Sequence, residues 1–170
     1  AELYTWNNGD NSKIINCENT GDITGNGGFP VVAGIVAQNV ADLRVENSSN
    51  DGTIQNNGGE TYASKIAGGI VGSSIGILKV DACENNGSVT AQENASIAGG
   101  IVGRTQGYAN DNAYQDVERI GYSFFDYNKL TIINSINTAN ISSEYKVGGI
   151  VACVEGLKLE VRNSQNECSQ

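Results

Sequence analysis

The sequence predicts an all-β fold, a parallel β-solenoid (β-helix) built from coils of about 30 residues with three strands each. Two repeated motifs predict it. An apolar, glycine-rich motif occurs four times, at residues 33–37, 67–72, 98–103 and 147–152. A second motif lies upstream of the first and occurs five times, at residues 14–23, 45–54, 80–89, 132–141 and 161–168. Motifs that return in this way indicate stacked units, each burying its apolar face only against its neighbours.

A strand is expected at the start of each unit. Every copy of the second motif opens with a β-branched residue, and in four copies a leucine stands two residues earlier: Leu43, Leu78, Leu130 and Leu159. This alternation is typical of a strand with one buried face.

A corner is expected next, because an asparagine occupies the same position in all five copies: Asn19, Asn50, Asn85, Asn137 and Asn166. In three copies a glycine follows two residues later. Asparagine and glycine tolerate positive φ, and asparagine can hydrogen-bond its own backbone. Stacking the copies would align these asparagines into a structural ladder with a spacing of about 4.8 Å.

The rest of each unit is predicted as a short strand (22–24, 53–55 or 88–91), a variable loop and a Gly-Gly-Ile-Val strand. Paired glycines in a strand would let the backbone of a neighbouring coil approach closely. Parallel crossovers favour a right-handed coil. A single sheet or an immunoglobulin-like sandwich is the competing fold, but neither predicts near-identical motifs at the same place in every unit. We therefore expect four coils and part of a fifth, in one domain spanning 1–170 or in a fragment of a longer array.

One interval is longer than the others, and its extra residues, 104–129, form a predicted loop insertion. The insertion holds four of the seven tyrosines and two of the three phenylalanines, with acidic residues between them. Insertions in solenoids lie on one face, which is often the binding face. The candidate ligand-binding residues are Tyr108, Tyr114, Asp116, Tyr122, Phe124 and Tyr127. Either these rings stack on a sugar or peptide, or the loop packs its own aromatics onto the coil below.

The insertion also contains a group of oxygen-bearing side chains, at residues 110–112, Asp116 and Glu118. Such ligands suit calcium, but the spacing lacks the glycine and terminal glutamate of an EF-hand. We predict no bound metal and no cofactor. Arg104 and Arg119 flank the insertion and are the basic residues that could neutralise an acidic sugar; we expect both to be solvated rather than catalytic.

Composition argues against several classes of function. The formal net charge is -9, from 19 acidic and 10 basic residues, and no Lys/Arg cluster suggests a nucleic-acid partner. The absence of histidine removes imidazole as a general base and as a metal ligand. No apolar run is long enough to span a membrane. No leader precedes Ala1, so we expect the chain to begin after a removed signal or at a fragment boundary.

The four cysteines are far apart in the sequence. Cys17 and Cys83 occupy a position that is serine in other copies of the second motif, so we expect small inward-facing residues. One intervening coil would separate them by about 9.6 Å, beyond disulfide reach. Cys153 and Cys168 fall on the last coils, and the sequence leaves open whether they are bonded.

The combination of Gly-Gly-Ile-Val-Gly with an upstream Asn-Cys/Ser-x-Asn-x-Gly-x-Ile resembles the GLUG-type repeats of large bacterial secreted and cell-surface proteins. These include the non-catalytic N-terminal regions of immunoglobulin A-cleaving metallopeptidases. The resemblance covers residues from about 14 to 168, apart from the insertion. It implies a β-solenoid at the bacterial surface that acts as stalk, spacer or adhesive module, and it implies no catalytic residues. The zinc-binding His-Glu-x-x-His of those peptidases is absent.

The expected function is therefore that of a non-enzymatic extracellular module of a bacterial surface or secreted protein, a spacer, an adhesin or both. The insertion would contact a host glycan or protein. The alternative is a carbohydrate-binding or carbohydrate-active β-helix that uses the same insertion. An enzyme needs titratable groups that converge on one face, whereas a spacer needs only the stacked core.

Overall fold

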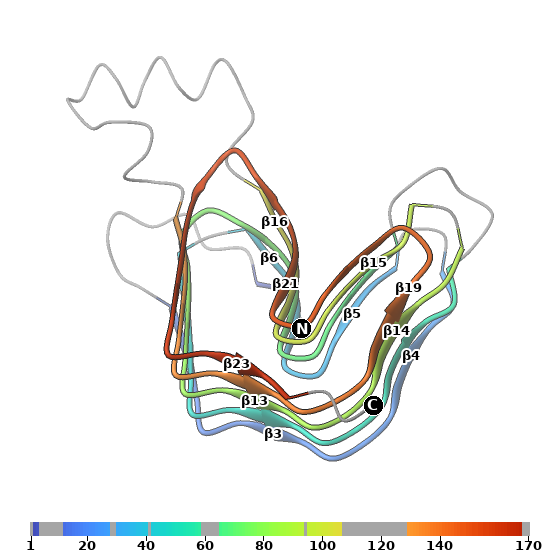
Figure 1. The fold of residues 1–170 in the computed structure, drawn as a ribbon, viewed down its shortest axis with the longest axis horizontal. Coiled ribbons are helices and arrows are strands. Elements are labelled where there is room, and N and C mark those ends of the chain that lie inside the picture. The colour runs from blue at the N-terminus through green and yellow to red at the C-terminus, as the bar shows by residue number, and fades with distance from the viewer. Residues whose placement is uncertain are drawn as a thin grey trace.

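The chain winds into a parallel β-solenoid (Figure 1). The structure is a computed structural model, and it describes residues 2–3, 12–27, 30–40, 42–58, 65–93, 95–106 and 129–167. Every regular element in these residues is a β-strand, and every strand pairing is parallel. The predicted fold class is confirmed.

Four complete coils and the start of a fifth stack along the axis. The first coil contains β2 (Ser12–Ile15), β3 (Glu18–Asn19), β4 (Ile23–Gly25), β5 (Val31–Ala33) and β6 (Val36–Val40). The second contains β7 (Leu43–Glu46), β8 (Ser49–Asn50), β9 (Ile54–Asn56), β10 (Ile66–Gly68) and β11 (Val71–Ile75). The third contains β12 (Leu78–Asp81), β13 (Glu84–Asn85), β14 (Val89–Ala91), β15 (Ile97–Gly99) and β16 (Val102–Gln106).

The fourth coil contains β17 (Lys129–Ile133), β18 (Ile136–Asn137), β19 (Ile141–Ser143), β20 (Lys146–Gly148) and β21 (Val151–Glu155). The fifth begins with β22 (Lys158–Arg162) and β23 (Gln165–Asn166). At the other end, β1 (Glu2–Leu3) pairs with β6 from the side opposite β11 and therefore lies one coil before it.

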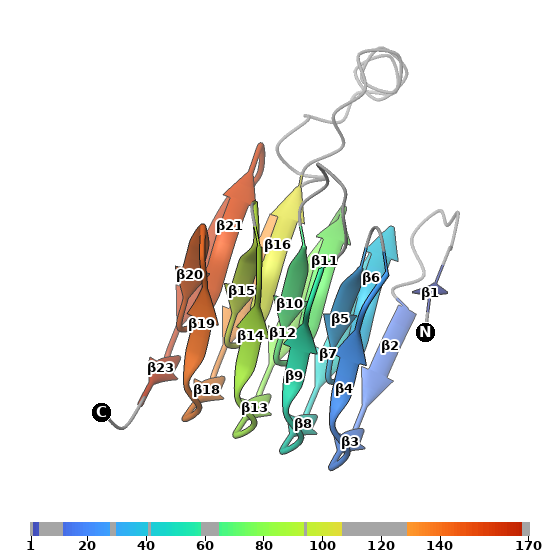
Figure 2. The same ribbon diagram turned by 90° about the vertical axis from the view of Figure 1, so that its right-hand side faces the viewer.

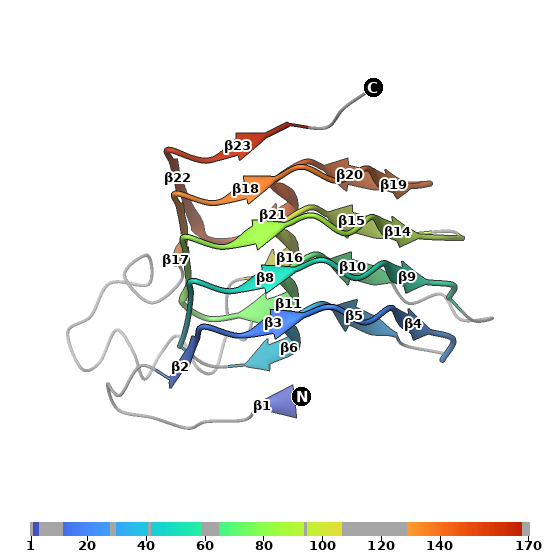
Figure 3. The same ribbon diagram turned by 90° about the horizontal axis from the view of Figure 1, so that it is seen from below.

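Equivalent strands stack into five sheets, which we number I to V in the order in which a coil visits them. Sheet I is β2-β7-β12-β17-β22, sheet II is β3-β8-β13-β18-β23 and sheet III is β4-β9-β14-β19. Sheet IV is β5-β10-β15-β20 and sheet V is β1-β6-β11-β16-β21. Figure 2 shows this stacking from the side, with β4, β9, β14 and β19 next to one another. The near-side strands of Figure 3 run from left to right as successive coils rise toward the C-terminus, so the coil is right-handed, as expected.

Each coil therefore has five strands rather than the three predicted from the sequence. The asparagine corner contains a two-residue strand of its own, such as β13. The Gly-Gly-Ile-Val segment is not one strand but a sharp corner, because β10 ends at Gly68 and β11 begins at Val71. A Cβ on Gly68 would lie 1.9 Å from the carbonyl oxygen of Val71, so the tight turn at this position requires glycine. The first coil has Ala33 at the equivalent position.

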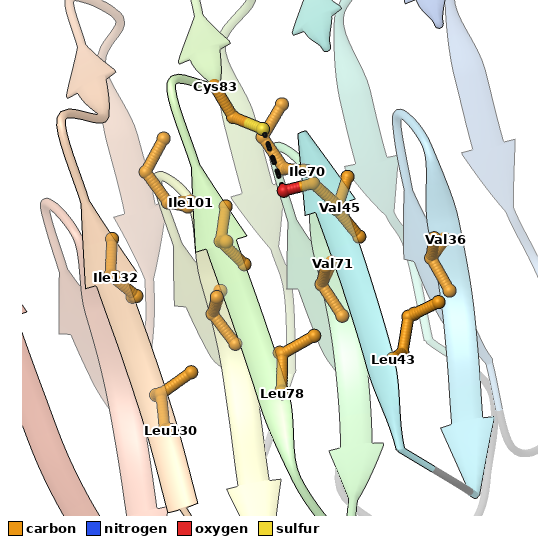
Figure 4. Close-up of a cluster of buried hydrophobic side chains, with 12 residues drawn as sticks. Val36, Leu43, Val45, Ile70, Val71, Leu78, Cys83, Ile101, Leu130 and Ile132 are labelled. Atoms are coloured by element: carbon orange, nitrogen blue, oxygen red, sulfur yellow. Dashed lines mark hydrogen bonds between the residues drawn. The ribbon is translucent and has the colours of Figure 1, made fainter. Parts of the chain in front are cut away.

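This glycine corner divides the interior into two apolar clusters. In Figure 1 the corner between β15 and β16 points inward, toward the strands of sheet II. The larger cluster lies between sheets I and V and includes Leu43, Leu78 and Leu130 (Figure 4). The smaller cluster lies between sheets III and IV and includes Ile54 and Val89. In-register stacking makes each cluster a set of continuous ladders, for example Leu43, Leu78 and Leu130.

The corner between sheets I and II has a left-handed backbone in every coil. Its residue has a φ of 48–56° and is asparagine in four coils and alanine in one: Asn16, Asn47, Ala82, Asn134 and Asn163. Asparagine tolerates this region better than other residues that have a Cβ, which explains why it recurs here.

Candidate functional site

The segment between β16 and β17 begins later and ends earlier than the predicted insertion 104–129. Arg104 belongs to β16, which continues to Gln106, and Lys129 is the first residue of β17. The candidate ligand-binding residues Tyr108, Tyr114, Asp116, Tyr122, Phe124 and Tyr127 lie outside the described residues. The same holds for the proposed calcium ligands at 110–118, for Arg119 and for Cys168. These predictions remain predictions.

The predicted asparagine ladder is present and runs the whole length of sheet II. The Nδ2 of each asparagine donates to the Oδ1 of the next, at 2.7 Å from Asn19 to Asn50 and 2.6 Å from Asn85 to Asn137. The intermediate step from Asn50 to Asn85 and the last step from Asn137 to Asn166 are both 2.7 Å. The three middle side chains are fully buried, so each link satisfies polar atoms that water cannot reach.

The second hydrogen of three of these amides goes to the chain's own backbone. Nδ2 of Asn19, Asn50 and Asn137 donates to the carbonyl oxygen two residues later, at 2.8–2.9 Å. This contact fixes the corner after the asparagine, as the sequence predicted from asparagine chemistry. The positive φ that was expected here occurs three residues before each ladder asparagine instead, as at Asn16 and Asn47. The ladder therefore has a structural role along its length, and the polar atoms of its three buried asparagines are not available to bind a ligand.

The predicted equivalence of cysteine and serine also holds. The Oγ of Ser135 accepts from the amide of Cys83 at 3.3 Å, as the Oγ of Ser48 accepts from the amide of Cys17 at 3.2 Å. Cys17 and Cys83 have free thiols, and the coil that contains Ser48 separates them. Cys83 is buried as predicted, but Cys17 is exposed because it lies in the first coil, at the end of the stack.

The described residues bring four titratable or nucleophilic side chains together at one place, where sheets IV and V meet on the outside of the solenoid. In coils 2 and 3 this angle is filled by the apolar side chains of Ile66 and Ile97, which are 5% and 3% exposed. In coil 4 the equivalent residue is Lys146, which pairs in register with Ile97. Lys146 faces Cys153, and Glu155 lies on the same strand as Cys153.

The contacts within this cluster are close. Nζ of Lys146 lies 3.3 Å from Sγ of Cys153, which donates to Oε1 of Glu155 at 3.2 Å. The guanidinium of Arg104 binds Oε2 of the same carboxylate at 2.7 Å. Arg104 is therefore paired with Glu155, whereas the sequence led us to expect a solvated side chain.

The electrostatics of the cluster favour a neutral thiol. Burial raises the pKa of Cys153, and its hydrogen bond to Glu155 acts in the same direction. Hydrogen bonds from Arg104 and then from Cys153 lower the pKa of Glu155. The hydrogen bond with Cys153 raises the pKa of Lys146, which therefore stays charged. A cysteine nucleophile needs a lowered pKa, so this arrangement is a charge-compensated contact between strands rather than an activated thiol.

Sequence reasoning missed this cluster. The alternation of a strand places Cys153 and Glu155 on one face, and this signal was available from the sequence. Lys146 and Arg104 reach them only because of the glycine corner and the stacking of β16 on β21, which sequence spacing does not reveal.

A further set of charges covers the outer face of sheet I. Ion pairs join Arg44 to Glu46, Lys79 to Asp81 at 2.9 Å and Lys129 to Glu160 at 2.6 Å. The hydrogen bond from Lys79 lowers the pKa of Asp81. Oppositely charged side chains that alternate in this way leave sheet I without a patch of one sign. Among the described residues, no group of three or more histidine, cysteine or acidic side chains is placed to hold a metal ion.

Comparisons with known proteins returned no relative. No protein-family model matches the chain, and neither a curated protein nor a solved structure is similar to it. In the part of the chain that the structure describes, no helix has the length and apolar character needed to cross a membrane.

Proposed function

We propose that this chain is a non-enzymatic extracellular repeat module of a bacterial surface or secreted protein and that it serves as a rigid spacer. One observation carries the proposal: the residues that the repeats share are used in contacts between coils. The asparagines link coil to coil, and the corner glycines lie against them, since a Cβ on Gly69 would be 2.3 Å from Cγ of Asn85.

The outward positions, in contrast, differ from coil to coil. On sheet I, Arg44, Lys79 and Thr131 stack at one such position, next to the uniform inward leucines. On sheet V the stacked residues include Val40, Ile75 and Gln106. A repeat that preserves its interior and varies its surface specifies stiffness and length rather than a reaction site.

The direction of the hydrogen bonds supports the same function. Strands run around the coil, so their inter-strand hydrogen bonds lie along the solenoid axis, from coil to coil. Tension between the ends would load many of these bonds at once. The asparagine ladder adds a second row of bonds along the same direction.

We propose an adhesive role for the insertion. Only Gly156 and Leu157 connect β21 to β22, and only Gly76 and Ile77 connect β11 to β12, whereas residues 107–128 stand between β16 and β17. The coil tolerates the extra chain because the strands on either side keep their register with neighbouring coils. We propose that this segment binds a host glycan or protein. A carbohydrate-active β-helix that uses the same segment is the second candidate, and its support is the aromatic and acidic composition of the segment.

A shortened variant tests these assignments. Replacing residues 107–128 by Gly-Leu copies the natural connection at residues 156–157, because Gln106 pairs with Glu155 and Lys129 with Lys158. This variant should keep the β-fold, measured by circular dichroism, intact. Both proteins are applied to a glycan array and incubated with neutral and acidic polysaccharides, whose cleavage is followed by reducing-end release. Glycan binding by the intact chain alone, without cleavage, supports an adhesin. Cleavage by the intact chain would overturn the non-enzymatic proposal. No binding and no cleavage by either protein leaves the spacer role and overturns glycan recognition.

A further inference from the structure

Each end of the described solenoid has unpaired strand edges, and the edges at the two ends are complementary to each other. At the C-terminal end, Leu159 and Val161 are 45% and 43% exposed, although the equivalent residues one coil earlier, Leu130 and Ile132, are fully buried. The strands β22 and β23 are the last members of sheets I and II among the described residues. Exposed strand edges beside apolar side chains favour pairing with another strand.

The asparagine ladder gives the stack a polarity. All four links run in the same direction, with the earlier coil donating and the later coil accepting. Asn166 therefore ends the ladder with an Nδ2 that makes no hydrogen bond within the described chain, and Asn19 begins it with an Oδ1 in the same condition. A donor at one end and an acceptor at the other fit head to tail but not face to face.

Two in-register pairs of sheet I also match, while Leu159 would stand opposite Ser12. Extending the pairing of β2 with β7 by one coil places β2 of a second copy on β22, so that Ile14 meets Val161 and Lys13 meets Glu160. The first contact buries apolar area, and the second places opposite charges side by side on the outer face. In sheet II the same register places Asn19 of the second copy over Asn166.

Strand β1 favours a second copy of this chain as the occupant. It lies in sheet V one coil before β6, at the level where a preceding copy would have β22 and β23 but no described strand of sheet V. In a head-to-tail stack β1 would pair with β21 of the preceding copy, with Glu2 opposite Cys153 and Leu3 opposite Val154. Contact between copies would thus involve sheets I, II and V.

We propose that the two ends bind each other, so that copies of this chain associate head to tail in solution into a continuous solenoid. The interface is heterologous and leaves one end free after each addition, so the assembly grows rather than closing into a dimer. This inference is independent of ligand binding by the insertion and of the spacer function.

Two variants block one end each. Val161→Asp places a charge on the exposed apolar edge of the last coil. Lys13→Pro removes a backbone amide from the open edge of β2. The amide of Asn16 donates to the second coil, and successive amides of a strand point to opposite sides, so the amide of Lys13 points away from the second coil, toward the open edge. Both sites are at exposed ends, so the fold should survive. Tyr145→Asp is the matched control, because Tyr145 is 66% exposed but lies outside sheets I, II and V.

The measurement is the mass in solution, by light scattering and analytical ultracentrifugation, over a wide range of concentration. The unaltered chain and the Tyr145→Asp control should grow from 17.8 kDa into a series of multiples. Each end-blocked variant alone should stay monomeric, and an equimolar mixture of the two should form a dimer and stop there. A monomeric unaltered chain overturns the proposal. So does continued assembly of either blocked variant, or a mixture that remains monomeric.

Discussion

The side chain of Asn85 lies directly against Gly69, so close that a Cβ on the glycine would be 2.3 Å from Cγ of the asparagine and 2.0 Å from the carbonyl oxygen of Gly100. The same relationship joins Gly34 to Asn50, Gly100 to Asn137 and Gly149 to Asn166. The two motifs found in the sequence are therefore the two sides of one contact between successive coils: the glycine motif of one coil lies against the asparagine of the next.

Gly69→Ala tests this contact. The added methyl meets backbone from the next coil, which cannot move alone, so we expect a loss of about 3 kcal/mol or more in the free energy of unfolding. Urea denaturation followed by circular dichroism measures it. Gly27→Ala is the control, because a Cβ there meets nothing within 4 Å, and it should change stability by no more than about 0.5 kcal/mol. Equal effects of the two substitutions would refute the close contact.

Asn85→Ala should destabilise the chain strongly. It removes the partners of Nδ2 in Asn50 and of Oδ1 in Asn137, both in fully buried residues, and we expect a cost of about 2–4 kcal/mol. Asn19→Ala, at the start of the ladder, removes one ladder link and should cost less. Chemical denaturation of both variants gives the comparison. A larger loss for Asn19→Ala would contradict a ladder stabilised by its buried links.

Ala82→Asn should stabilise the protein. Ala82 has a φ of 52° at the left-handed corner where the other four coils have asparagine. Replacing alanine by a residue that accepts this conformation should add about 0.5–1 kcal/mol. The reverse change, Asn47→Ala, should remove a similar amount. Thermal and urea unfolding of the two variants measure the difference, and the prediction fails if Ala82→Asn lowers stability.

The Cys83 thiol should make stability fall at high pH. Burial raises the pKa of this thiol to about 11 from its ordinary value of 9.0. Below pH 9 the thiol is protonated in both folded and unfolded chains. Between about pH 9 and 11 only the unfolded chain ionises, so the free energy of unfolding should decrease by about 2–3 kcal/mol.

Cys83→Ser isolates this contribution, since serine occupies the equivalent buried position as Ser48 and Ser135. The variant should fold normally and lose the Cys83 component of the pH dependence. Identical pH profiles for the two proteins, measured by urea denaturation, would show that the thiol does not titrate as its burial predicts.

The repeated motifs in the sequence alone were sufficient to predict the parallel right-handed solenoid, the inward leucine columns, the asparagine ladder and the shared position of cysteine and serine. Each of these depends on local periodicity and on one rule, that equivalent residues stack, so the repeat itself carries the information.

Only the tertiary structure decided three other features: the number of strands in a coil, the splitting of the Gly-Gly-Ile-Val segment into a corner and the division of the core into two clusters. These features depend on where backbone from different parts of the coil meets, as Gly69 meets Asn85 and Gly100. The cluster of Arg104, Lys146, Cys153 and Glu155 has the same origin: the fold back at the corner and the stacking of two coils bring together charges that sequence spacing keeps apart.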